Sequence, residues 1–164
     1  MKKSAIMLHK IRCNISEIRA VLRDFINAPN LKYTFVGGIA LYAIALFALI
    51  RGDIYYIDDN RSSIANATWN NYSRYLATFM LNGIATLGKG SIDFSPLSQI
   101  IAVCFVVASA MILIYVIRGK FDLIGVVASL PLGLSPHFLQ NLSFKFDSLT
   151  MAMALFFAIL PFLF

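Results

Sequence analysis

Uninterrupted apolar runs long enough to cross a bilayer constrain this chain more than any other feature of its sequence. The run from Tyr33 to Ile50 has eighteen residues and no charge. A helix of that length rises about 27 Å, which is close to the thickness of a hydrocarbon core. Further apolar runs cover 97–117, 121–134, which Pro131 interrupts, and 149–164. We therefore expect about four transmembrane helices.

The composition supports an all-α integral membrane protein. Hydrophobic residues make up 59% of the chain and charged residues 13%, with a mean hydropathy of +0.76, far from the values of a soluble domain. We predict a cytoplasmic amphipathic arm at 1–32 and a transmembrane domain at 33–164, with outer loops at 51–96 and 135–148. The last run reaches Phe164 without a polar flank, so we expect a chain truncated at its C-terminus.

The distribution of Lys and Arg predicts the orientation, because basic residues beside membrane segments stay on the cytoplasmic side. Arg118 and Lys120 lie between the second and third runs. Seven basic residues precede the first run: Lys2, Lys3, Lys10, Arg12, Arg19, Arg23 and Lys32. A multi-pass protein with a cytoplasmic N-terminus follows, and both predicted outer loops then lie on the opposite side.

The N-terminal arm has the pattern of an amphipathic helix that ends at Asn27-Ala28-Pro29. Its apolar residues recur every three or four positions, with three arginines off that face: Ile11, Ile15, Ile18, Leu22 and Phe25. We expect an interfacial helix on the inner leaflet, or alternatively a helix packed on the rest of a larger protein. The net charge of +6 suits anionic lipid, and we expect no nucleic-acid partner.

Two adjacent carboxylates, Asp58 and Asp59, follow the first membrane run by eight or nine residues. One interpretation is a solvated turn, because Asp-Asp-Asn favours turns. The other is a general base, because neighbouring acids partly shielded by Tyr55, Tyr56 and lipid repel each other and raise one pKa.

The rest of the first outer loop predicts local helical structure. Aromatic and apolar residues at three- and four-residue spacings indicate a helix along the membrane surface: Tyr72, Tyr75, Leu76, Phe79 and Met80. Ser95 and Pro96 predict an N-cap and a first helical residue for the next span. Asp93 just before them is either a favourable charge at that helix N-terminus or a functional group.

No metal site or cofactor is expected from the sequence. Cys13 and Cys104 fall in the arm and in a membrane run, and His9 and His137 are far apart. No His/Cys cluster has metal-ligand spacing, and glycine-rich phosphate loops and nucleophile elbows are absent from the sequence.

Four motifs in order resemble the serotype-converting O-antigen glucosyltransferases of bacteria and their phages, the Gtr type II family. They are YIDDNR at 56–61, DFSPL at 93–97, SLPLGLSP at 129–136 and LQNLSFKFDS at 139–148. The resemblance runs from about Arg51 to the end of the chain and covers the N-terminal part of that family. It implies a fold of the GT-C type in the bacterial inner membrane.

The resemblance also implies a reaction. The donor would be undecaprenyl-phosphate glucose, the acceptor the O-antigen of lipopolysaccharide on the periplasmic face, and the transfer inverting. Asp58 and Asp59 match the position of the catalytic base in the first outer loop.

Cations are needed for the phosphate of the lipid, and polar groups for the sugars. The outer-side candidates for substrate binding are Arg61, Arg74, Lys89, Asp93, Lys145 and Asp147. Each basic residue has a simpler role as a headgroup contact, and Asp147 has one as the N-cap of the fourth helix. Of the cations, Lys145 is the strongest candidate, in a short loop where polar and aromatic residues alternate.

Two other functions fit the same sequence. One is a four-span protein that handles lipid-linked sugar without reacting it, as a flippase does. The other is an inactive truncated transferase.

Overall fold

The computed structural model describes residues 2–52, 75, 79, 95–145 and 147–164, and all the regular structure among them is helical. The predicted all-α class is therefore confirmed for the described residues. The helices are α1 (Lys2–Asn27), α2 (Leu31–Gly52), α5 (Leu97–Arg118), α6 (Leu123–Ser129), α7 (Pro131–Leu134), α8 (Pro136–Ser143), α9 (Ser148–Ile159) and the 3-10 helix η2 (Leu160–Leu163).

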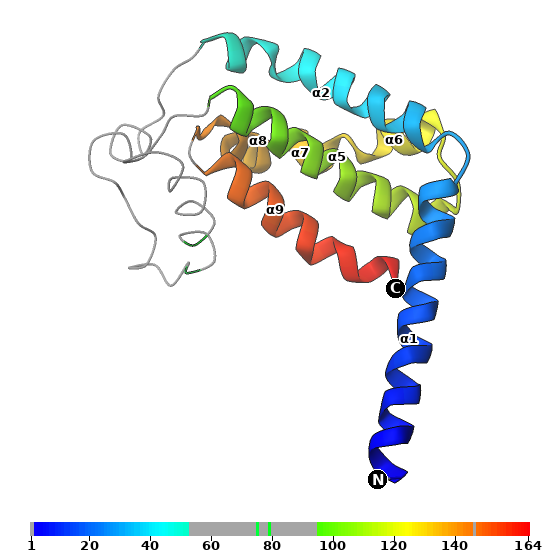
Figure 1. Ribbon diagram of the computed structural model, residues 1–164. Helices are drawn as coiled ribbons and strands as arrows, with labels where there is room; N and C mark the ends of the chain where they lie inside the picture. The colour runs from blue at the N-terminus through cyan, green and yellow to red at the C-terminus, as the bar shows by residue number, and fades with distance from the viewer. Residues whose placement is uncertain (1, 53–74, 76–78, 80–94, 146) are drawn as a thin grey trace.

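Helix α5 is the centre of the bundle. It contacts α2 and α9 along its length, and also α6, α7, α8 and η2 (Figure 1). Its residues are apolar on nearly every face, which is the pattern of a helix surrounded by others. Small side chains allow close approach, since Ala102 on α5 and Ala152 on α9 are both fully buried.

In the part of the chain that the structure describes, two helices are long and apolar enough to cross a membrane by themselves, α2 over 31–48 and α5 over 97–118. A third crossing is available if the pair formed by α6–α7 and α8, bent by 65°, counts as one broken span. The segment Ser148–Leu163 is a shorter apolar helix. The predicted number of four spans thus stays a prediction.

The region 135–148, predicted as an outer loop, contains helix α8, and its position on the outer side stays a prediction. Pro131 and Pro136 each lie at the start of a helix, α7 and α8. Proline lacks the amide hydrogen that a helix interior needs but is tolerated in the first turn. The two prolines therefore divide this apolar region into short helices, and helical periodicity resumes after each.

The basic turn between α5 and α6 is built by two specific residues. Gly119 takes a left-handed conformation with φ 65° and its N–H donates to the Tyr115 carbonyl at 2.8 Å, which is a common way to end a helix. Asp122 then caps α6 by accepting from the Gly125 N–H at 2.8 Å. The same carboxylate accepts from Arg118 at 2.6 Å, so it ties the two helices together.

Candidate functional site

Buried polar side chains gather at the end of the bundle where α5 begins, α8 ends and α9 begins. We call this group the polar end cluster, and its members are Ser98, Gln99, Lys145, Asp147 and Ser148. Polar groups buried in a membrane protein are costly and commonly mark functional sites. Within the described part of the chain, this cluster is therefore the candidate functional site.

Hydrogen bonds from α5 hold the segment between α8 and α9 in place. The Ser98 hydroxyl donates to the Lys145 carbonyl at 2.9 Å, and the Gln99 amide donates to the Leu142 carbonyl at 3.4 Å. Ser95 in turn donates to the Gln99 side-chain oxygen at 3.3 Å. The backbone that carries Lys145 is thus fixed to the first turn of α5.

Lys145 and Asp147 bring two charges into this cluster. The residues are only 3% and 8% exposed, and a charge removed from water is expensive unless other groups stabilise it. Both stand at the N-terminus of α9, where the helix dipole presents partial positive charge. The Lys145 ammonium group and the N-terminus of α9 contribute positive charge that would attract an anion, and the Asp147 carboxylate contributes an opposing negative charge.

Ser148 opens α9 and is completely buried. Its N–H donates to the Phe144 carbonyl at 3.3 Å. Within the residues that the structure describes, its hydroxyl has no hydrogen-bond partner. A hydroxyl left unsatisfied in the interior costs free energy, and sites that later receive a ligand are one place where such a group occurs.

Two predicted capping roles need correction. The residue at the N-cap of α5 is Pro96, which makes no side-chain capping hydrogen bond, and the Ser95 hydroxyl donates to the Gln99 side chain. Asp147 does occupy the N-cap of α9, but its side chain makes no capping hydrogen bond. Its carbonyl accepts from the Thr150 hydroxyl at 2.9 Å and the Met151 N–H at 3.0 Å.

The other predicted site residues lie outside the described residues: Asp58, Asp59, Arg61, Arg74, Lys89 and Asp93. The predicted surface helix of this loop also lies there, except for Tyr75 and Phe79. The flanking helices are described, and α2 ends on the same side of the bundle on which α5 begins (Figure 1). The described ends that flank the paired acids in sequence, the end of α2 and the start of α5, therefore lie at the end of the bundle that holds the polar end cluster.

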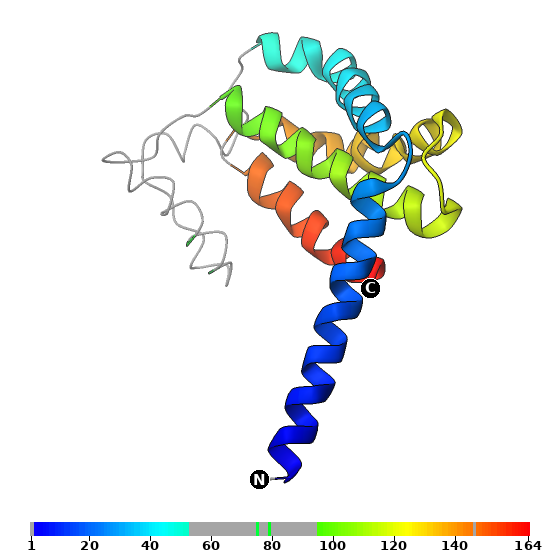
Figure 2. The ribbon, with the colours of Figure 1, turned by 45° about the vertical axis from the view of Figure 1, so that its right-hand side comes forward.

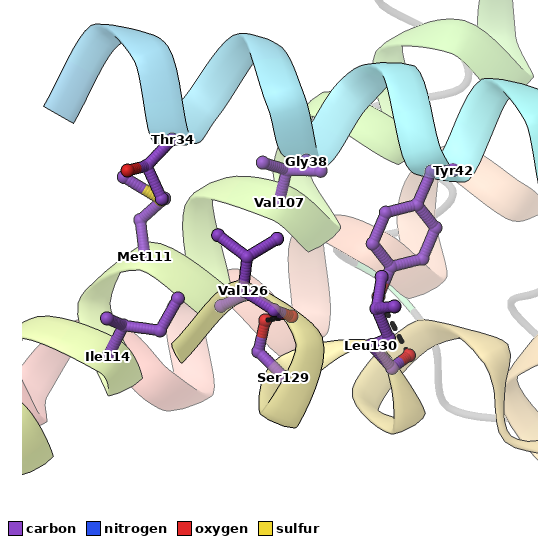
Figure 3. A pocket seen from close by; sticks show the side chains of 10 residues that line it. Thr34, Gly38, Tyr42, Val107, Met111, Ile114, Val126, Ser129 and Leu130 are labelled. Carbon is purple, nitrogen blue, oxygen red and sulfur yellow. Dashed lines mark hydrogen bonds between the residues drawn. The ribbon is translucent and has the colours of Figure 1, made fainter. Parts of the chain in front are cut away.

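A small cavity lies elsewhere, between α2, α5 and α6 (Figure 3). The space that water could occupy in it is about 10 Å³, close to the requirement of one water molecule. Most of its lining is apolar, and the Ser129 hydroxyl already donates to the Val126 carbonyl at 2.8 Å. This cavity is too small for a sugar or a lipid headgroup.

Tyr42 borders the cavity and joins α2 to the break between α6 and α7. Its hydroxyl donates to the Leu130 carbonyl and accepts from the Gly133 N–H, both at 3.1 Å. The Leu130 carbonyl also accepts from the Leu134 N–H at 3.0 Å, so the Tyr42 hydroxyl joins α2 to the backbone at the place where α6 ends and α7 begins. The residue is 1% exposed, and it has a structural role.

The sequence reasoning selected Lys145 and Asp147 but missed Ser98, Gln99 and Ser148. The sequence does indicate two of these residues, because Ser98 and Gln99 are polar and lie in the first turn of a 22-residue apolar helix. Among the described residues, no group of three or more His, Cys, Asp or Glu could hold a metal.

Comparisons with known proteins now identify the family. The family model described as "Glucosyl transferase GtrII" matches residues 46–164. One similar curated protein is described as "Uncharacterized 55.3 kDa protein in gtrB 5'region" from Salmonella phage P22, and it is 26% identical over 117 residues. That alignment covers 71% of this chain and 24% of the relative, so the chain spans about a quarter of the relative's length. No solved structure matches. Since the family match covers well over half of the sequence and agrees with its motifs, the chain belongs to the glucosyl transferase GtrII family.

Proposed function

We propose that this chain acts in a membrane glucosyltransferase that moves glucose from undecaprenyl-phosphate glucose to the O-antigen of lipopolysaccharide. Membership of the GtrII family supports the glucosyl transfer. The burial of two charged residues, Lys145 and Asp147, supports the polar end cluster as the place where the donor binds.

The arrangement of charges supports transfer on the periplasmic face. The basic turn at Arg118 and Lys120 lies at one end of α5, and the polar end cluster lies at the other. The basic arm joins the turn end, because Phe25 packs on Tyr115 and Phe121. Basic segments are retained in the cytoplasm, so the polar end cluster and the loop with the paired acids would face outward.

In the proposed reaction, a carboxylate of Asp58 or Asp59 takes the proton from an acceptor hydroxyl. The hydroxyl oxygen forms a bond to the anomeric carbon as the bond from that carbon to the phosphate oxygen breaks. Glucose is transferred with inversion, and undecaprenyl phosphate leaves with the electron pair. Lys145 and the N-terminus of α9 would stabilise the negative charge on the leaving phosphate.

The remaining polar residues have supporting roles in this proposal. Arg61, Arg74 and Lys89 are further cations for the phosphate, and Arg is suited to bidentate contact. Asp93 and Asp147 would accept hydrogen bonds from sugar hydroxyls. The scheme uses neither a metal nor another cofactor.

Transfer of radiolabelled glucose from undecaprenyl-phosphate glucose to lipopolysaccharide tests this proposal in membranes that contain the chain. Replacing the base, Asp58→Asn or Asp59→Asn, should reduce the rate about 100-fold or more. Asp24→Asn is the control, since Asp24 is an exposed carboxylate on α1 and should leave the rate unchanged.

Two outcomes would contradict the proposal. Equal rates in all three variants would exclude Asp58 and Asp59 as the base. Donor binding by the unmutated chain without any transfer would instead indicate a protein that handles lipid-linked sugar without reacting it.

A further inference from the structure

Helix α1 lies across the direction of the bundle rather than along it. Figures 1 and 2 both show α2, α5 and α9 running side by side while α1 crosses one end of them and extends past it. If α2 and α5 follow the bilayer normal as spanning helices, a helix crosswise to them follows the membrane plane. This is the end with the basic turn between α5 and α6.

The last turns of α1 are packed on the bundle through its apolar face. Phe25 contacts Tyr115 and Phe121 edge to face, with ring centroids 5.2 and 5.8 Å apart. Val21 and Leu22 pack on a second cluster whose buried members are Ile112, Ile159 and Leu163. The orientation of α1 about its own axis is therefore fixed by these contacts.

The same face continues beyond the bundle without a partner in the described chain. Ile15 and Ile18 are 44% and 40% exposed, and their spacing of seven and four residues from Leu22 places them in line with it. Ile11 extends the pattern one turn further in the sequence. Since the face turned to the bundle is turned to the membrane, Ile15 and Ile18 are directed toward the lipid next to the bundle.

Charges on α1 are arranged as an interface requires. Arg12, Arg19 and Arg23 are seven and four residues apart, so they share one flank of the apolar face. Glu17 and Asp24 share a different side, seven residues apart. Of these, Arg19, Arg23, Glu17 and Asp24 are all exposed. Long basic side chains at the edge of an apolar face reach lipid phosphates while their stems stay in contact with hydrocarbon.

We propose that α1 binds the surface of a bilayer rich in anionic phospholipid, with Ile15 and Ile18 at the acyl boundary and Arg19 and Arg23 on headgroup phosphates. The helix lies in the plane of the membrane, and its last turns are packed on the bundle. It thereby sets the depth and tilt of the bundle in the bilayer. This role is independent of the transferase reaction.

Single-cysteine labelling of the full chain tests the proposal. Cys13→Ser and Cys104→Ser remove the native thiols. An environment-sensitive NBD probe is then placed by Ile15→Cys or Ile18→Cys, with Glu17→Cys and Ala20→Cys as matched controls on the other sides of the same turns. The protein is reconstituted in vesicles of phosphatidylethanolamine and phosphatidylglycerol, with iodide on both sides. The first two probes should show blue-shifted emission and little quenching by iodide, and the controls should be quenched freely.

The charge contribution is measured in the Ile18→Cys background. Iodide protection of the probe at position 18 reports the ratio of membrane-bound α1 to α1 that is exposed to water. Arg19→Gln and Arg23→Gln should each lower this ratio about fivefold, since a basic residue near an anionic surface contributes about that factor. Asp24→Asn should not lower it. Phosphatidylcholine vesicles should weaken docking as the arginine substitutions do.

Three results would overturn the proposal. Equal iodide quenching at all four positions would place α1 in water. Protection that persists in phosphatidylcholine and increases with the ratio of protein to lipid would indicate a second copy on this face. Protection unaffected by lipid charge or by the arginine substitutions would show that α1 does not bind anionic headgroups through Arg19 and Arg23.

Discussion

At the scale of single residues, Tyr42 and Gly133 show how the broken helices are held to the bundle. A side chain at Gly133 would meet Val106 Cγ1 at 2.6 Å and Tyr42 Cε1 at 2.7 Å. Tyr42 also bonds to the Gly133 amide. Only a residue without a Cβ allows α7 to approach α2 and α5 this closely.

Gly133→Ala should therefore destabilise the protein by about 1–3 kcal/mol, the usual cost of overpacking a filled core. Gly37→Ala on α2 is the matched control, because a Cβ there would meet nothing within 4 Å, and alanine favours a helix by roughly 0.5–1 kcal/mol over glycine. Denaturant unfolding in detergent micelles, followed by circular dichroism, measures both. Equal stability of the two variants would contradict the close packing at Gly133.

Only some residues of the polar end cluster can be predicted from the sequence. Lys145 is predicted from the sequence because a lipid phosphate needs a cation and this residue lies in a short segment where polar and aromatic residues alternate; Asp147 lies in the same segment. Ser98, Gln99 and Ser148 were not predicted, because each is polar but uncharged and its importance depends on which backbone segment comes within hydrogen-bond distance. That distance depends on tertiary packing, which apolar periodicity does not encode.

At the scale of elements, the turn from α5 to α6 depends on one carboxylate. Hydrogen bonds from Arg118 and the Gly125 amide, together with the positive charge of Arg118, lower the pKa of Asp122. A carboxyl whose pKa is lower in the folded than in the unfolded state stabilises the fold above its unfolded pKa, about 3.9. That contribution is lost as the pH falls through the lower folded value.

Asp122→Ala should thus reduce the thermal stability of the protein well above pH 4, because it removes both the cap of α6 and the ion pair. The difference from the unmutated protein should shrink as the pH falls below about 4, where the unfolded carboxyl takes up a proton, and should level off below the lower pKa of the folded state. Thermal unfolding followed by circular dichroism across this range measures it. Lys120→Gln is the control: its contact with Asp122 is 3.9 Å long and exposed, so its effect should be small at every pH. A difference that grows toward low pH would contradict the assigned role.

The apolar runs of the sequence predict the bounds of a helix well where a single helix covers the whole run. The sequence predicted 33–50 and 97–117, and the structure has α2 at Leu31–Gly52 and α5 at Leu97–Arg118. It also predicted the end of α1 at Asn27, before Pro29. Residues 135–148, predicted as an outer loop, contain helix α8, because Pro136 is tolerated in the first turn of a helix. The side of the membrane on which they lie stays a prediction.

At the scale of the whole molecule, the bundle has two chemically different ends. The basic turn and the packed end of α1 lie at one end. The polar end cluster, the end of α2 and the start of α5 lie at the other. This separation supports the proposed orientation, in which α1 would bind anionic lipid at one face and the polar end cluster would bind the lipid-linked sugar at the other.

The central claim is that the polar end cluster binds the phosphate of a lipid-linked sugar, and donor binding tests it most directly. Titration of the detergent-solubilised chain with fluorescent undecaprenyl-phosphate glucose gives the dissociation constant. Lys145→Gln should weaken binding about 10- to 100-fold, because hydrogen bonds to a charged group contribute about 1.5–3 kcal/mol. Lys145→Arg keeps the charge and should retain part of the affinity, and an unchanged circular dichroism spectrum shows that each variant is folded. Lys120→Gln, at the opposite end of the bundle, should bind as the unmutated chain does. Equal affinity of the Lys145→Gln and Lys120→Gln variants would contradict the claim.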